Sequence, residues 1–125
     1  MKKLILFLIL FLTILTISCS SDSENSNNSS FEGNWSGQFT GINDNGTWTV
    51  NINSNGVVSG TAISNVFSDT YNINGNVSEN GTLTATLGTT SVGGSFIGEL
   101  RGNNASGTWT NTNLGYNGNW TGSKQ

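Results

Sequence analysis

Hydrophobic and polar residues alternate along most of the chain from residue 31 onward, in short runs that glycines and Asn-Gly pairs interrupt about every ten residues. Strict alternation is typical of β-strands with one buried face, and Gly and Asn-Gly are typical of tight turns between antiparallel strands. No run repeats with the helical period of about 3.6 residues, and the chain contains no proline. The pattern predicts an all-β domain of eight short strands, at residues 33–41, 46–53, 57–63, 70–77, 82–87, 95–101, 105–111 and 116–122.

Within each expected strand, alternate residues form one apolar face, and the opposite face is almost entirely Thr, Ser and Asn. One polar face per strand suits antiparallel sheets that have water on one side. The apolar face predicts the interior of the domain. Its members are Trp35, Gly37, Phe39, Trp48, Val50, Ile52, Val58, Gly60, Ala62, Tyr71, Ile73, Gly75, Val77, Leu83, Ala85, Leu87, Phe96, Gly98, Leu100, Gly107, Trp109, Tyr116, Gly118 and Trp120.

Eight sequential strands of this kind form either a closed up-and-down barrel or a sandwich of two sheets. The tryptophans favour the barrel, because all four occur in a repeated Gly-x-Trp-Ser/Thr unit on the first two and last two strands. Closure pairs the eighth strand with the first and makes these four strands neighbours. Counting strand directions then predicts that Trp35 and Trp120 meet at one end of the barrel, and that Trp48 and Trp109 meet at the other.

Gly33-Asn34-Trp35, at the start of the first strand of such a meander, resembles the Gly-x-Trp of the calycin group of barrels, which includes the lipocalins and the avidins. The resemblance covers residues 33–123 in strand order. It implies a small antiparallel barrel, and in that group the barrel holds a small ligand. The short strands and loops here leave little room for a deep lipocalin calyx, and the inward face has no polar cluster like that of an avidin site. The resemblance therefore supports the fold more than an inherited activity.

The N-terminus has the pattern of an export signal. Lys2 and Lys3 precede fourteen uncharged residues at 4–17, which as a helix would span roughly 21 Å, less than the ~30 Å needed to cross a membrane. Leu15-Thr16-Ile17-Ser18-Cys19 resembles the lipobox of bacterial lipoprotein precursors. The resemblance implies cleavage before Cys19 and attachment of diacylglycerol to its thiol. The alternative is an ordinary signal peptide whose apolar segment happens to end at a cysteine.

Residues 20–30 contain no apolar side chain and predict a flexible tether, because such a segment cannot bury enough surface to fold. A tract of serines and acids behind a lipidated cysteine also resembles the export tag of surface lipoproteins. The expected organisation is a signal peptide at 1–18, the lipidated Cys19 and tether at 19–30, and a barrel domain at 31–125. This organisation implies an exported protein anchored by lipid to the bacterial envelope, at the outer membrane and exposed on the cell surface.

The charge balance narrows the set of partners. Removal of residues 1–18 leaves Arg101 and Lys124 against seven acidic residues, a net charge of −5. Such a chain repels nucleic acid and has no basic patch for anionic lipid. The expected partners are the membrane, through lipid on Cys19, and a small apolar ligand, a glycan or an envelope protein.

The sequence offers little chemistry for catalysis. It contains no histidine, and Asp44, Asp69 and Glu79 fall in predicted turns on different connections, so no carboxylate pair is indicated. The Asp44-Asn45-Gly46 run is interpreted as turn chemistry rather than a calcium site. We therefore expect no catalytic residue, no cofactor and no metal. Glu99 and Arg101 alternate onto the outer face of one strand and predict a surface ion pair.

The aromatic residues are the candidate site residues. They are interpreted as core, because they fall in phase with Val, Ile, Leu and Phe, or alternatively as the lining of a ligand site. The inward glycines either make room for the rings or leave a lumen. The leading hypothesis is a non-enzymatic, surface-anchored lipoprotein that binds a small molecule, glycan or protein, or is a structural envelope component; a carboxylate-dependent hydrolase acting on envelope polymers is the alternative. The aromatic candidates are Trp35, Trp48, Trp109, Trp120, Tyr71 and Tyr116.

Overall fold

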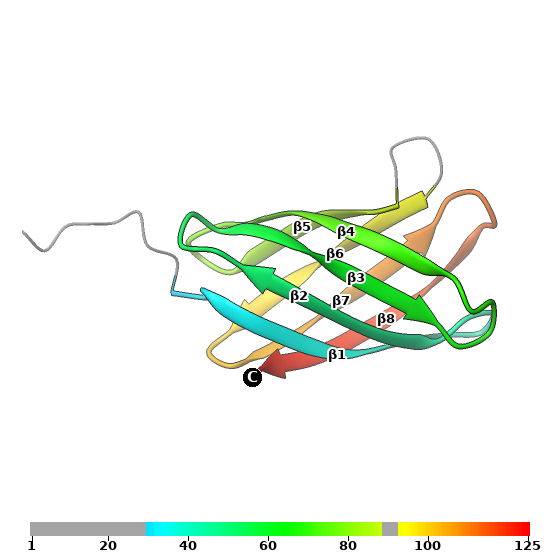
Figure 1. Ribbon diagram of the computed structural model, residues 1–125, viewed down its shortest axis with the longest axis horizontal. Helices are drawn as coiled ribbons and strands as arrows, with labels where there is room; N and C mark the ends of the chain where they lie inside the picture. The colour runs from blue at the N-terminus through cyan, green and yellow to red at the C-terminus, as the bar shows by residue number, and fades with distance from the viewer. Residues whose placement is uncertain (1–29, 89–92) are drawn as a thin grey trace, which may run out of the picture.

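A computed structural model describes residues 30–88 and 93–125 of the chain. Consecutive strands pair antiparallel, and β1 also pairs with β8, so the sheet closes into a barrel (Figure 1). The predicted all-β barrel is confirmed and the two-sheet sandwich is wrong. The predicted signal peptide, Cys19 and the tether up to residue 29 lie outside the described residues. The strands are β1 Gly33–Gly41, β2 Gly46–Ile52, β3 Val57–Ser64, β4 Thr70–Val77, β5 Thr82–Gly88, β6 Gly93–Arg101, β7 Asn104–Asn111 and β8 Tyr116–Lys124.

The alternation of apolar and polar residues sets the two faces of the barrel wall. Every apolar side chain predicted to point inward is buried, except Tyr71 and Tyr116, which are half-buried against the core. The predicted strand ends are within two residues of the observed ones. The largest differences are at β6, which starts at Gly93, and at β8, which continues to Lys124. An eight-stranded barrel is just wide enough for side chains to fill its interior.

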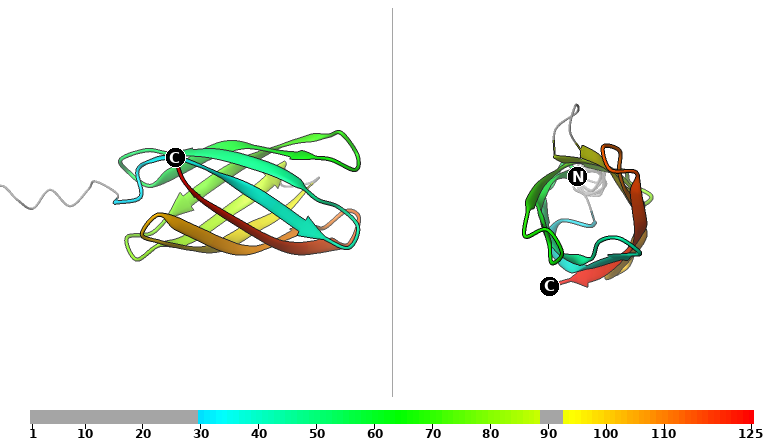
Figure 2. Two further views of the ribbon diagram at one scale, coloured as in Figure 1. Left: turned by 90° about the horizontal axis from the view of Figure 1, so that it is seen from below. Right: turned by 90° about the vertical axis from the view of Figure 1, so that its right-hand side faces the viewer.

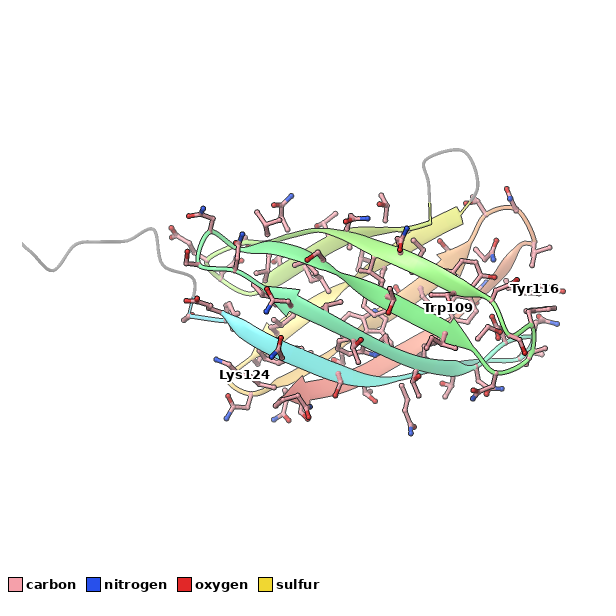
Figure 3. The ribbon with its side chains drawn as sticks, in the orientation of Figure 1. Trp109, Tyr116 and Lys124 are labelled. Carbon is pink, nitrogen blue, oxygen red and sulfur yellow. The ribbon has the colours of Figure 1, made fainter. Side chains whose placement is uncertain are left out.

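Because the strands alternate in direction, the connections gather at two ends (Figure 2). We call the end where the described chain begins the tether end; it holds residues 30–32, the turns at 53–56, 78–81 and 102–103, and the C-terminus. We call the opposite end the distal end; it holds the connections at 42–45, 65–69 and 112–115. Lys124 lies toward the tether end, whereas Trp109 and Tyr116 lie toward the distal end (Figure 3).

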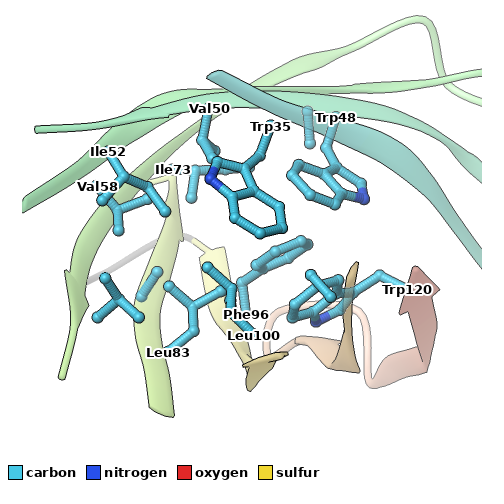
Figure 4. Close-up of a cluster of buried hydrophobic side chains, with 14 of the residues drawn as sticks. Trp35, Trp48, Val50, Ile52, Val58, Ile73, Leu83, Phe96, Leu100 and Trp120 are labelled. Atoms are coloured by element: carbon cyan, nitrogen blue, oxygen red, sulfur yellow. The ribbon is translucent and has the colours of Figure 1, made fainter. Parts of the chain in front are cut away.

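The predicted tryptophan pairs are wrong. β8 runs on to Lys124, which is the residue that lies opposite Trp35, and this shift places Trp120 opposite Phe39 instead. Trp120 therefore lies in the middle of the barrel and not beside Trp35. It packs edge-to-face on Trp48, with ring centroids 5.4 Å apart, and stacks on Phe96 at 4.4 Å (Figure 4).

The other two tryptophans close the ends of the core. At the tether end, Trp35 packs against Phe31 and its indole N–H donates to the Phe31 carbonyl at 2.9 Å. Toward the distal end, Trp109 packs edge-to-face on Phe39, with centroids 5.3 Å apart. These aromatic groups belong to one hydrophobic core, which also contains the buried aliphatic side chains. Each such ring buries on the order of 150–250 Å².

Three of these tryptophans follow one packing rule. Each indole lies over a glycine two strands away and donates a hydrogen bond to the carbonyl of the residue before that glycine. A Cβ on the glycine would lie within 3 Å of the ring, so the ring fits only where that side chain is missing. These three glycines therefore make room for rings, whereas a Cβ at Gly37, Gly60 or Gly75 would first meet the backbone of a neighbouring strand. The three sets are Trp48 over Gly122 with Thr121 O at 3.2 Å, Trp109 over Gly41 with Thr40 O at 3.1 Å, and Trp120 over Gly98 with Ile97 O at 3.1 Å.

Candidate functional site

The cavities found inside the part of the barrel that the structure describes are small. The four tryptophans are between 1% and 3% exposed. One cavity of about 20 Å³ lies toward the distal end, and one of about 10 Å³ lies among Trp35, Trp48 and Trp120. A single water molecule needs about 10–15 Å³ on this measure, whereas a drug-sized ligand needs several hundred. In this conformation the described interior holds a water molecule at most, and the tryptophans form its core.

The two tyrosines lie at the edge of the core. Tyr71, in β4, lines the distal cavity together with Asp44 and Trp109. Tyr116 is the first residue of β8, and its ring stacks on that of Phe67, with centroids 6.2 Å apart and 16° between the planes. Both tyrosines therefore belong to the distal end. Cys19, the predicted lipidation site, lies outside the described residues.

A buried carboxyl organises the distal end. Asp44 is 4% exposed, and its Oδ1 accepts hydrogen bonds from the Ser64 hydroxyl at 2.6 Å and from the Asn45 amide at 2.8 Å. The Ser64 oxygen in turn accepts from the amides of Val66 and Phe67, at 3.2 and 2.9 Å. A buried carboxylate is tolerated where such bonds satisfy it. The interpretation of Asp44 as an ordinary turn residue is therefore incomplete.

The same loops are joined at a second point. The amide of Asn65 donates to the carbonyl of Asn45 at 2.8 Å, and the Asn65 side-chain amide donates to Asn45 Oδ1 at 3.0 Å. Ser68 has a φ of 59°, the left-handed conformation that non-glycine residues rarely adopt. The loop at 65–69 is therefore held in one defined shape that presents Phe67 toward Tyr116. Sequence patterns gave no signal for this, because it depends on contacts between residues twenty positions apart.

Apolar side chains are exposed at the tips of these connections. Ile42 is 96% exposed, Leu114 is 50% exposed and Phe67 is 40% exposed. Exposed apolar residues in ordered loops at one end of a scaffold are typical of contact surfaces. We call this surface, together with the buried Asp44 that holds its loops, the distal rim. Its residues are Ile42, Asp44, Val66, Phe67, Asp69, Leu114 and Tyr116.

The distal rim carries negative charge. The pKa of the Tyr71 hydroxyl is raised above its ordinary value of 10.0, first by burial and then by the nearby carboxylates of Asp69 and Asp44. Both described cations, Arg101 and Lys124, lie on strand ends at the opposite, tether end. Arg101 forms the predicted surface ion pair there, with its Nη2 2.9 Å from Glu99 Oε1. The described part of the distal rim therefore holds acids and no base.

None of the three hollows that an acid lines is lined by two carboxylates. Asp44 is the one acid lining the distal cavity, and Glu99 is the one acid lining each of the two hollows on the outer wall. Hydrolysis of glycosidic bonds uses two carboxyl groups that flank the substrate about 5–10 Å apart. Among residues 30–88 and 93–125, no group of three or more metal-binding side chains occurs. Nothing in these hollows favours the hydrolase hypothesis.

Comparisons with protein-family models, with curated proteins and with solved structures found no match. In the described ranges, no helix has the length and hydropathy that a membrane span requires.

Proposed function

We propose that the chain is a non-enzymatic lipoprotein of the bacterial envelope, anchored through Cys19, whose calycin-like barrel is a binding module that contacts its partner with the distal rim. One observation carries the proposal: the interior is filled, while ordered loops at the distal end expose apolar side chains to solvent. A purely structural component has no need for an exposed apolar end, since such surface is a liability unless a partner covers it.

The path of the chain supports a definite orientation. Phe31 is buried against Trp35 at the tether end, so the described chain enters the barrel opposite the distal rim. Lipid on Cys19 would hold the tether end nearer the membrane. The distal rim would then project away from the membrane, and on an outer-membrane protein exposed at the surface it would face the exterior.

Metabolic labelling tests the anchor. The full chain is expressed in a bacterial host with radiolabelled palmitate, and we expect label in the wild type and none in Cys19→Ser. Mass spectrometry of the wild type should find Cys19 as the acylated first residue, since the lipobox resemblance implies cleavage before it. An unlabelled wild type, or cleavage elsewhere, would contradict the lipoprotein assignment.

A second measurement tests the binding surface. Envelopes of the source bacterium are treated with a short chemical cross-linker, and complexes of the anchored chain are separated by size. Phe67→Ser with Leu114→Ser should return the chain to the size of the monomer. Val57→Ser is the matched control, because Val57 is 44% exposed but lies at the tether end. Equal loss in both variants would contradict a role for the distal rim.

A further inference from the structure

The shape of the distal rim indicates whether its partner is a small molecule or a protein segment. The adjoining cavity of about 20 Å³ is too small to enclose a metabolite or a lipid chain. The apolar side chains are instead loop tips, and Ile42 is almost fully exposed. Tips that protrude make contact with an extended surface. A protein segment suits this geometry better than a small molecule.

The acidic residues of the distal rim favour a partner segment that carries basic residues. Asp69 is exposed, the buried Asp44 lines the adjoining cavity, and both carboxylates help to raise the pKa of the Tyr71 hydroxyl. A partner with Lys or Arg complements these acids, and complementary charge raises association rates and rejects wrong partners. A second copy would bring two more acids to the interface, and an anionic lipid headgroup would be repelled in the same way.

The aromatic rings add to the preference for a cation. Phe67 and Tyr116 stack with 16° between their planes, and Phe67 remains 40% exposed. Ammonium and guanidinium groups bind to exposed aromatic faces, and Lys and Arg also bury their aliphatic stems on apolar surface. Apolar tips, aromatic faces and carboxylates thus lie together on three connections that hydrogen bonds and a ring stack join.

We propose that the distal rim docks a Lys- or Arg-bearing, partly apolar segment of another envelope protein. The proposal rests on the proposed function and names the partner's chemistry. The loops need little reordering to bind, because Asp44, Ser64 and Asn65 already hold them. Binding to a preorganised surface loses less free energy, because fewer loops and side chains must be ordered.

Site-specific photo-cross-linking in the anchored full chain tests the proposal. A benzophenone amino acid replaces Leu114 in one variant and Val66 in another, and Val57 at the tether end serves as the exposed apolar control. Cross-links are made in intact cells of the source bacterium and mapped by mass spectrometry. Each probe is repeated with Asp69→Lys at the distal rim and with Glu79→Lys at the tether end as a matched charge control.

We expect both distal probes to cross-link to one protein at a segment that contains Lys or Arg. Asp69→Lys should reduce the yield on the order of tenfold, since a like charge now faces the cation, and Glu79→Lys should leave it unchanged. Cross-links to lipid, to a second copy or to a segment without basic residues would overturn the inference, as would equal yields in the two charge variants. Cross-links from Val57 alone would overturn both the inference and the proposed use of the distal rim for binding. No cross-link from any position would overturn both proposals.

Discussion

The hydroxyl of Ser64 donates a hydrogen bond to Oδ1 of Asp44 across 2.6 Å, and both side chains are buried. Ser64 ends β3, and Asp44 belongs to the connection between β1 and β2, so this bond joins two loops that are twenty residues apart in sequence. Because the Ser64 oxygen also accepts from the Phe67 amide at 2.9 Å, the carboxyl of Asp44 indirectly fixes an aromatic residue of the distal rim.

Asp44→Ala should loosen the loop at 65–69 and lower the free energy of unfolding by about 1–3 kcal/mol, because the buried Ser64 hydroxyl loses its acceptor. Asp44→Asn should retain most of the stability, since its amide oxygen can still accept. Denaturant unfolding gives the energies, and hydrogen exchange at Val66 and Phe67 reports on the loop. Asp69→Ala is the exposed control and should change stability by no more than about 0.5 kcal/mol. If Asp44→Ala and Asp69→Ala behave alike, the bond has no organising role.

The paired glycines beneath Trp120 lead to a second prediction. Gly98 and Gly107 lie opposite each other in β6 and β7. A Cβ on either would lie 2.6 Å from the Trp120 ring and closer still to a backbone carbonyl oxygen, at 2.1 Å from Ser106 O or 2.0 Å from Ile97 O. Gly98→Ala or Gly107→Ala should therefore destabilise the barrel by about 1–3 kcal/mol through overpacking. Urea unfolding followed by tryptophan fluorescence measures the change. Ser106→Ala, on the outer face beside Gly107, should have little effect, and similar losses in all three would show that strand propensity dominates.

The alternation of residues predicted the architecture well, for a physical reason. A one-residue slip would move a whole strand's apolar set to the solvent, so the pattern fixes both strand position and facing. Glycines every ten residues or so marked the turns, and strand ends were placed within two residues. Even the ion pair of Glu99 and Arg101 follows from alternation, because both side chains lie on the outer face of β6.

What the pattern could not supply was the relative shift of paired strands. Trp120 lies opposite Phe39, four residues from the predicted neighbour Trp35, because the stagger of a closed barrel is set by the whole sheet and not by any one strand. The distal rim was missed for a related reason. Neither Asp44 nor Ser64 belongs to a recognisable sequence motif. They come into contact only because β1, β2 and β3 pair and bring their connections to the same end of the barrel.

Alkaline titration tests the electrostatics of the distal rim. The chain has two tyrosines, so Tyr116→Phe leaves Tyr71 as the one phenol whose ultraviolet absorbance changes on ionising. Its pKa in the fold is raised by burial, Asp69 and Asp44, so the folded state holds the proton more tightly than the unfolded chain. Stability should therefore fall as the pH rises above about 10.

Neutralising Asp69 separates its effect on the pKa of Tyr71 from the effect of burial. In the Tyr116→Phe background, Asp69→Asn should lower the pKa of Tyr71 toward its ordinary value, and the alkaline loss of stability should become smaller. Glu79→Gln, at the tether end, should leave the titration curve unchanged. Far-UV circular dichroism at each pH confirms that the barrel stays folded. A pKa that does not respond to Asp69→Asn would mean that Asp69 makes no contribution and that the causes are burial and Asp44.

Making a hole in the core tests whether the barrel interior is filled. Trp120 is 1% exposed, stacks on Phe96 and packs against Trp48. Trp120→Ala should lower the free energy of unfolding by about 3–5 kcal/mol and leave an apolar cavity. Such a cavity stays dry and accepts a small aromatic molecule, so added indole should raise the melting temperature of this variant but not of the wild type. A comparable rise in the melting temperature of the wild type would contradict a filled interior, because the wild-type core side chains leave no space for indole.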